Sequence, residues 1–341
     1  MEPTGELPAA EDGAPEPVTG DATTERVPEN VRWTRRLGRA FWNQNERRLR
    51  AFWRLSGHTL LTVGALVAIG VVVALATMLR AYLGPSQHSR FASLWRLVEP
   101  SLAVATVLQG AVATGVTWLA RRVLDRRPFG TLGLRRSGFV VRDLAFGIAL
   151  SGVMIAAAFV ILLACGWLRL GPPAWETSSA GAVLASLAGF GSIFVCVGWY
   201  EELLSRGYWF VNLRDGIGVR TAAVVSSSVF ALGHVGNPNA TLASTASLVG
   251  AGLLLAWCVV RTGQLWMSIG MHVGWNFFEG PVFGFPVSGI QTFTLVRHEM
   301  TGPPLLTGGA FGPEAGLLLL AIQGLGALVV WWATRERPIE S

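Results

Sequence analysis

The sequence has few charged residues for its length. Only 14% of its 341 residues are Asp, Glu, Lys or Arg, whereas a soluble domain usually has about a quarter. Lysine is absent, so every basic side chain is an arginine. The mean hydropathy is +0.47, and several apolar runs reach the roughly 20 residues that a helix needs to cross a bilayer. The composition therefore excludes an ordinary soluble domain and indicates an integral membrane protein.

Cysteine is scarce, and two common hydrolase motifs are missing. The three cysteines, Cys165, Cys196 and Cys258, lie in apolar runs without CxxC or Cys/His spacing, so we interpret them as small packing residues. The sequence contains no His-Glu-x-x-His zinc motif and no Gly-x-Ser-x-Gly elbow. Residues 226–228 are serines in an apolar run, where hydroxyls usually bond the helix backbone. We therefore expect neither disulfides nor a serine mechanism.

Composition divides the chain into four parts. Residues 1–30 are rich in Pro, Glu, Gly and Thr and predict a disordered acidic tail. Residues 31–56 interleave arginines with aromatic and aliphatic side chains. This juxtamembrane segment forms either an interfacial helix on an anionic membrane or a flank that only sets orientation. Residues 57–334 are expected to be the transmembrane domain, and residues 335–341 a cytoplasmic tail.

The apolar segments predict an all-α, polytopic helical bundle with about eight transmembrane helices. We place them at about 57–80, 100–121, 142–166, 180–200, 219–236, 241–260, 264–284 and 312–333. Arginines concentrate in the loops after the second, fourth, sixth and eighth segments. This asymmetry favours a multi-pass protein of the plasma (cytoplasmic) membrane with both termini in the cytoplasm. The arginines lie in short loops beside apolar segments, where residues that set membrane orientation are expected. We therefore expect no nucleic-acid partner.

Ionisable side chains inside membrane helices are costly, which makes them functional candidates. The fourth segment ends with the adjacent acids Glu201 and Glu202, followed by Arg206. Adjacent residues lie about 100° apart on a helix, whereas Glu202 and Arg206 are four residues apart and can pair on one face. Glu201 then points elsewhere, and a carboxylate in apolar surroundings suits a general base. The competing interpretation is a pair of interfacial acids with a structural arginine.

Two further segments contain histidines. His234 follows Phe230 near the end of the fifth segment, and His272 and Asn276 share one face of the seventh. A lone histidine on an apolar helix is more often a packing residue, and helix–helix hydrogen bonding would also explain the pair. Polar groups on three segments nevertheless favour one converging cluster over separate accidents.

Such a cluster permits two chemistries. In the first, Glu201 and His234 activate a water, while His272 and Asn276 stabilise an oxyanion. In the second, His234 and His272, with Glu201, bind a divalent metal that lowers the pKa of its bound water. The residues alone do not separate the two.

These motifs resemble those of the CPBP family of CAAX proteases and bacteriocin-processing enzymes, also called the Abi family. That family has Glu-Glu-x-x-x-Arg, Phe-x-x-x-His and His-x-x-x-Asn/Asp motifs in this order on separate helices. Here they are residues 201–206, 230–234 and 272–276. The Arg127–Arg135 stretch resembles the segment before the family's core. The resemblance covers about 125–333 and implies an all-helical membrane endopeptidase.

The resemblance also implies roles for residues. Glu201 would activate the water with His234 as its partner, His272 and Asn276 would stabilise the oxyanion, and Glu202, Arg206 and Phe230 would support the site. Family members are described both as metallo- and as glutamate-dependent enzymes, so the cofactor is left open between zinc and none. Expected partners are the lipid bilayer and a peptide or protein substrate of CAAX-like or leader/bacteriocin type. The oligomeric state is left undefined.

Two other functions stay open. A non-catalytic membrane scaffold or immunity protein could use the same fold. A proton-coupled transporter could use the same carboxylates and histidines as a proton relay, although the chain has no paired halves that suggest inverted repeats.

Overall fold

The computed structural model describes residues 41–43, 46, 48–83 and 90–337. The tail expected over residues 1–30 lies outside the described residues, as do residues 31–40 of the juxtamembrane segment. The described part of that segment contains two short strands followed by the start of the first long helix. Its strands β1 (Trp42–Asn43) and β2 (Arg48–Leu49) are antiparallel, and a helix begins only at Ala51.

The predicted all-α membrane bundle is confirmed. Six helices in the described part are long and apolar enough to cross a bilayer: α2 (Ala51–Leu83), α3 (Arg90–Val123), α4 (Val140–Ala164), α6 (Ala180–Glu202), α9 (Leu242–Thr262) and α12 (Leu317–Thr334). The other two expected segments form the shorter helices α8 (Val219–Leu232) and α10 (Trp266–Phe277). Helix α8 ends because the chain turns from Gly233, which places His234 in the turn, and α10 continues directly into the π-helix η3 (Phe278–Val282).

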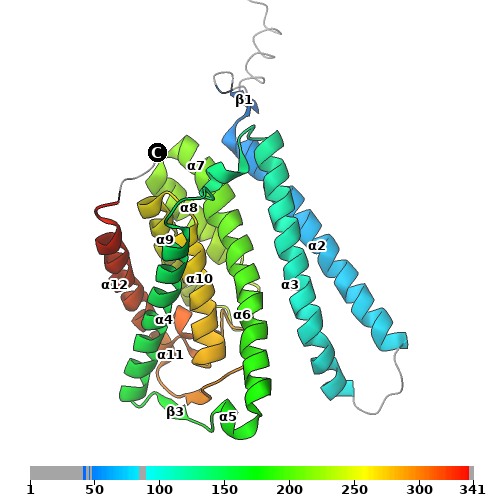
Figure 1. The fold of residues 1–341 in the computed structure, drawn as a ribbon, viewed down its shortest axis with the longest axis vertical. Coiled ribbons are helices and arrows are strands. Elements are labelled where there is room, and N and C mark those ends of the chain that lie inside the picture. The colour runs from blue at the N-terminus through cyan, green and yellow to red at the C-terminus, as the bar shows by residue number, and fades with distance from the viewer. Residues whose placement is uncertain (1–40, 44–45, 47, 84–89, 338–341) are drawn as a thin grey trace, which may run out of the picture.

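Short elements connect the helices at the two ends of the bundle (Figure 1). One end has η1 (Phe129–Leu132), the π-helix η2 (Leu203–Trp209) and α7 (Phe210–Ile217). The opposite end has β3 (Leu168–Leu170), α5 (Ala174–Thr177), η3 (Phe278–Val282), β4 (His298–Met300), α11 (Pro304–Thr307), η4 (Gly309–Phe311) and η5 (Pro313–Ala315). Strands β3 and β4 are antiparallel, with Arg169 opposite Glu299.

Helices α4 and α10 pack closely at the centre of the bundle because glycines form their contact. A Cβ atom on Gly147 would lie 2.4 Å from the carbonyl oxygen of Met267, and one on Gly270 would lie 2.3 Å from that of Leu144. Side chains such as Met154 and Met271 fill the core beside this contact. Small residues allow such close approach between membrane helices, and here they fix the height of α10, which bears His272.

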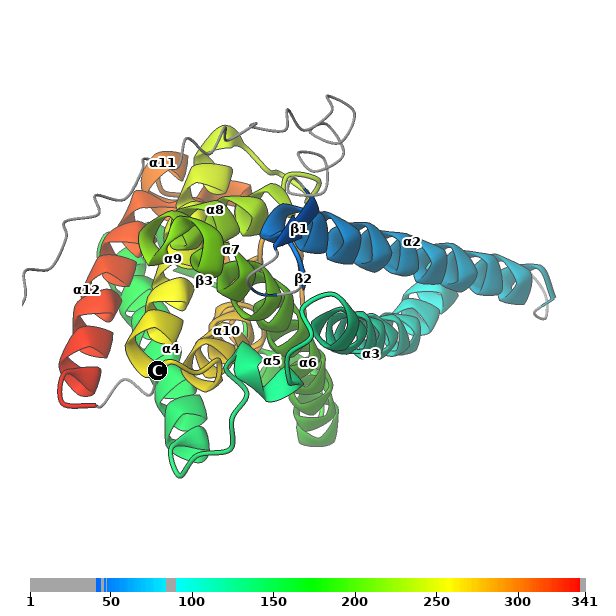
Figure 2. The same ribbon diagram turned by 90° about the horizontal axis from the view of Figure 1, so that it is seen from above.

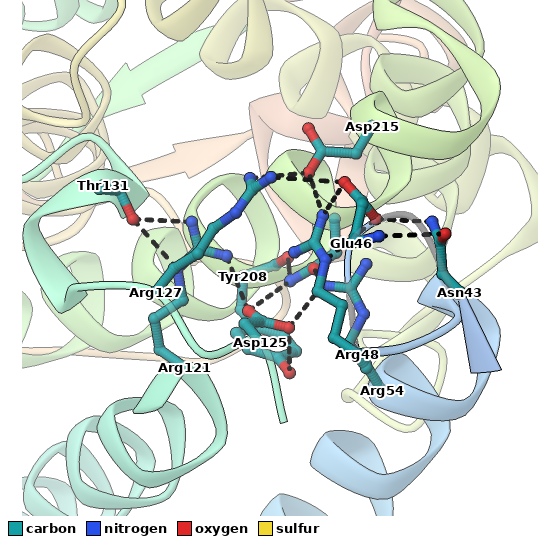
Figure 3. Close-up of polar contacts among 11 residues, drawn as sticks. Asn43, Glu46, Arg48, Arg54, Arg121, Asp125, Arg127, Thr131, Tyr208 and Asp215 are labelled. Carbon is teal, nitrogen blue, oxygen red and sulfur yellow. Dashed lines mark hydrogen bonds and ion pairs between the residues drawn. The ribbon is translucent and has the colours of Figure 1, made fainter. Parts of the chain in front are cut away.

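Helices α2 and α3 diverge from the other helices at the end where α2 stops and α3 begins (Figures 1 and 2). Its opposite end is held by a buried group of polar side chains around Asp125, which we call the anchor cluster (Figure 3). Asp125 accepts from Arg54 at 2.6 Å and from Arg121 at 2.7 Å. Asn212 and Tyr208, from α7 and η2, also donate to it. The cluster therefore ties α2 and α3 to the rest of the bundle.

A more exposed layer of charges covers the anchor cluster. Arg48 bonds Glu46 at 2.7 Å and Asp215 at 3.3 Å, and Arg127 also bonds Asp215 (Figure 3). The hydrogen bonds from Arg48 lower the pKa of Glu46 below its ordinary value. This layer joins the β1–β2 hairpin to α7.

Candidate active site

Adjacent acids at the end of α6 point in different directions, as the helix period predicts. The side chain of Glu202 is fully buried, whereas that of Glu201 is 22% exposed. Glu201 lines a chamber inside the bundle, and its Oε2 atom has no hydrogen-bond partner among the described residues. The two carboxylates therefore have separate environments from the start.

Glu202 is the centre of a buried polar group. Its Oε1 atom accepts from Arg206 Nη1 at 2.8 Å and lies 2.9 Å from His272 Nδ1, while its Oε2 atom accepts from the hydroxyl of Ser268. The pairing of Glu202 with Arg206 expected from their spacing is thus present, even though η2 is wound as a π-helix. Glu202 also fixes the His272 ring from α10, an interaction between helices distant in sequence.

Arg206 has two further contacts that stabilise its buried charge. Its Nη2 atom donates to the carbonyl oxygen of Gly252 on α9 at 3.1 Å. Its guanidinium lies 4.3 Å from the ring centroid of Phe230 on α8, a cation–π contact. A Cβ atom at position 252 would lie 3.0 Å from Arg206, so glycine leaves room for the guanidinium. Phe230, at the head of the second motif, thus supports the arginine of the first.

Both histidines face Glu201. The Nε2 atom of His272 lies 3.7 Å and that of His234 lies 4.0 Å from Glu201 Oε2. His234 Nδ1 lies 2.9 Å from the carbonyl oxygen of Phe230, so Nδ1 bears the proton of that hydrogen bond. The Nε2 atom of the neutral ring is then an acceptor directed toward Glu201. The three side chains converge from α6, α10 and the turn after α8.

Glu201, His234, His272 and Asn276 all line a single chamber of about 880 Å³. Asn276 follows His272 by one turn of α10 and is buried. Most of the other lining side chains are apolar, such as Phe190 and Phe194 of α6. The chamber therefore combines a small polar centre with a mainly apolar wall, and apolar surroundings strengthen electrostatic interactions at that centre.

The geometry also tests the metal-site interpretation. His234, His272 and Glu201 are donor types found in catalytic zinc sites, where metal–ligand distances are about 2.0–2.2 Å. Among the described residues, however, no group of three or more His, Cys, Asp or Glu side chains is placed to hold a metal ion. The side chains as positioned do not fit a metal ion.

Residues 183–278 match the family described as type II CAAX prenyl endopeptidase Rce1-like. The chain carries a CPBP-family domain. The matched segment runs from α6 to just beyond α10 and includes all three motifs, so it is shorter than the 125–333 range expected from the resemblance. Neither a curated protein nor a solved structure matches the chain. This family match, together with the six long apolar helices, supports a multi-pass membrane protein with a protease-type domain.

Sequence reasoning missed two members of this CPBP site. Ser268 precedes His272 by four residues on α10, so the helix period places both on the face that meets Glu202. That spacing could have revealed it. The carbonyl of Gly252 has no side chain to mark it, and only the packing of α9 against η2 brings it to Arg206.

Proposed function

We propose that this protein is an intramembrane endopeptidase in which the Glu201 carboxylate activates the attacking water. The supporting observation is the convergence of two imidazole Nε2 atoms on Glu201 Oε2, at 3.7 and 4.0 Å, in the wall of a mainly apolar chamber. These gaps are too long for direct hydrogen bonds but suit groups that share a water or a substrate atom.

In the proposed reaction, Glu201 takes a proton from a water whose oxygen attacks the carbonyl carbon of the scissile peptide. His234 Nε2 accepts a hydrogen bond from the second O–H group of that water and so orients it. The oxyanion receives hydrogen bonds from Asn276 and from His272, which as an imidazolium donates through Nδ1 to Glu202 and through Nε2 to the oxyanion. The carbon–nitrogen bond then breaks, and Glu201 returns its proton to the leaving amine.

The substrate class follows from the setting of the site. The family acts on peptides, and the chamber lies within helices that cross the membrane. We therefore propose membrane-associated substrates of CAAX-like or leader/bacteriocin type, cleaved in the cytoplasmic membrane. Most arginines of the loops lie at the end of the bundle that holds the anchor cluster, which supports a cytoplasmic location for that end and for both termini.

Glu201→Gln is the decisive variant because it keeps the size of the side chain and removes the base. We expect cleavage of a quenched fluorescent peptide library by the purified protein to fall about 1,000-fold or more, in line with the loss of a general base. Glu176→Gln is the matched control, since Glu176 is exposed on α5 and does not line the chamber. Cleavage retained by Glu201→Gln at the wild-type rate would overturn the proposal.

A chelator separates the glutamate mechanism from a metal mechanism. We expect the wild-type cleavage rate to be unchanged after treatment with EDTA, because the proposed reaction has no metal-dependent step. Loss of cleavage on chelation that zinc restores would show that His234 and His272 rearrange into metal ligands.

A further inference from the structure

One face of α2 is polar although the rest of this helix is aliphatic. His58, Thr59 and Thr62 line the same chamber as Glu201, whereas Leu60 and Leu61 between them are exposed on the outer side. Spacings of three and four residues place the polar side chains on one face. Helix α2 lies outside the family match at residues 183–278, so this face is a feature of the N-terminal hairpin.

These polar groups have hydrogen-bonding atoms without partners. His58 Nδ1 and the hydroxyls of Thr59 and Thr62 are buried from solvent, and in the described part of the chain none has a hydrogen-bond partner. His58 is only 1% exposed and Thr62 only 5%. Buried polar groups in proteins are nearly always hydrogen-bonded, so three without a partner on one face of one helix require an explanation.

Several other hydroxyls in these helices bond their own backbone, although the hydroxyl of Ser227 on α8 also has no partner in the described part of the chain. Thr114, Thr262 and Thr334 each donate to the carbonyl four residues earlier, at 2.6, 2.8 and 2.7 Å respectively. Thr245 does the same at 2.9 Å. This is the usual arrangement for threonine in a helix. Thr59 and Thr62 differ because their hydroxyls have no partner in the described part of the chain, and both residues line the chamber.

The anchor cluster holds this face in position. Arg54, one turn before His58, bonds Asp125 at 2.6 Å (Figure 3). The His58 ring stacks on Tyr208 with centroids 3.8 Å apart, and its Nε2 atom lies 3.0 Å from the Thr117 hydroxyl of α3. Rotation of α2 about its axis would break these contacts. The orientation of the polar face toward the chamber is therefore fixed by the fold.

We propose that Thr59 and Thr62, with His58 Nδ1, bind the backbone of an extended substrate peptide across the chamber from Glu201. This inference rests on the proposed endopeptidase function. A peptide bond open to attack has left its helix, so the neighbouring N–H and C=O groups need new partners in a water-poor site. The unpaired groups of α2 supply them, and the α2–α3 hairpin is then a substrate-binding part of the enzyme.

The test is the double variant Thr59→Val/Thr62→Val, which keeps side-chain shape and removes both hydroxyls. With the library peptide that the wild-type protein cleaves fastest, we expect KM to rise about tenfold while kcat changes less than about twofold. Thr59→Ser/Thr62→Ser restores the hydroxyls and should return KM to near the wild-type value. Thr245→Val is the matched control, because its hydroxyl bonds its own helix outside the chamber and KM should not change.

A substrate series then identifies the backbone as the ligand. Replacing one peptide N–H at a time by an ester oxygen should raise KM for the wild-type protein at the contacting position, and the same replacement should have little further effect in the valine variant. An unchanged KM in the valine variant, or a KM that serine does not restore, overturns the α2 proposal. Because Glu201→Gln is assayed with the same peptide, its inactivity beside a fully active valine variant leaves the endopeptidase function standing. Equal cleavage by the wild type and Glu201→Gln overturns the function itself.

Discussion

Two neighbouring glutamates at the end of α6 differ in what surrounds them, and this difference separates stability from chemistry. Glu202 is fully buried and compensates the fully buried charge of Arg206, whereas Glu201 faces the chamber. Removing one partner of a buried ion pair leaves the other charge buried and unpaired, which costs about 3–5 kcal/mol. The same change at Glu201 strands no such partner.

Glu202→Gln is therefore expected to destabilise the protein by about 3–5 kcal/mol, because Arg206 loses its buried counter-charge. His272 also loses the carboxylate that fixes its ring, so cleavage should fall as well. Thermal unfolding in detergent measures the first effect and the peptide assay the second. Glu201→Gln is the control, since it should abolish cleavage with an almost unchanged unfolding temperature. Equal stability of the two variants would contradict the assignment of Glu202 to support.

At this scale, sequence spacing was informative within each helix. It predicted that Glu202 pairs with Arg206 and that Glu201 points elsewhere, because both follow from the period of one helix. It did not predict that His272 and Ser268 contact Glu202, since those contacts depend on how α10 packs against α6.

Between elements, the contact of α4 with α10 sets the height of His272 in the site. Gly270→Ala should destabilise the protein by about 1–3 kcal/mol, because the new Cβ would lie 2.3 Å from the Leu144 carbonyl oxygen and force the helices apart. The unfolding temperature and the cleavage rate should both fall, because His272 shifts with α10. Gly189→Ala in α6 is the matched control, since nothing lies within 4 Å of its added Cβ and alanine is the better helix former. A Gly270→Ala protein as stable as the wild type would refute this tight packing.

The anchor cluster has a similar influence on the α2–α3 hairpin. Asp125→Asn removes the shared counter-charge of the buried Arg54 and Arg121, and we expect about 3–5 kcal/mol of destabilisation. Asp215→Asn provides the comparison, because its pairs are partly exposed and pairs of that kind contribute about 0–1 kcal/mol. Thermal unfolding in detergent should show that Asp125→Asn is much less stable than Asp215→Asn. The reverse order of stability would count against the cluster as the anchor.

Across the whole molecule, charge is distributed unevenly between the two ends of the bundle. The end with the anchor cluster has the arginines around residues 121–142, 214–220 and 335–337, whereas the opposite end has fewer: Arg169 and Arg297, with Arg80, Arg90 and Arg96 near the α2–α3 loop. This asymmetry is the basis for the proposed cytoplasmic location of the first end, according to the positive-inside rule.

An epitope tag inserted beside Ser137, in the loop before α4, should consequently bind antibody only in inverted membrane vesicles. A tag beside Ser178, after α5, should bind only in right-side-out vesicles. Cleavage activity of each tagged protein controls for correct folding. The opposite pattern of labelling would invert the proposed orientation and move the arginine-rich end outside.

The sequence by itself determined the membrane class, the positions of the apolar helices and the motif residues, because these depend on composition and on the local period of a helix. The sequence also favoured one polar cluster, but tertiary structure alone decided which atoms of Glu201, His234 and His272 face one another, that Gly252 and Ser268 stabilise the buried pair, and that α2 has unpaired hydroxyls on residues that line the chamber. In the juxtamembrane segment, strand β1 pairs with β2, and Arg48 pairs with Asp215 far along the chain. Such contacts join residues distant in sequence, and a local pattern has no information about which helices will be neighbours.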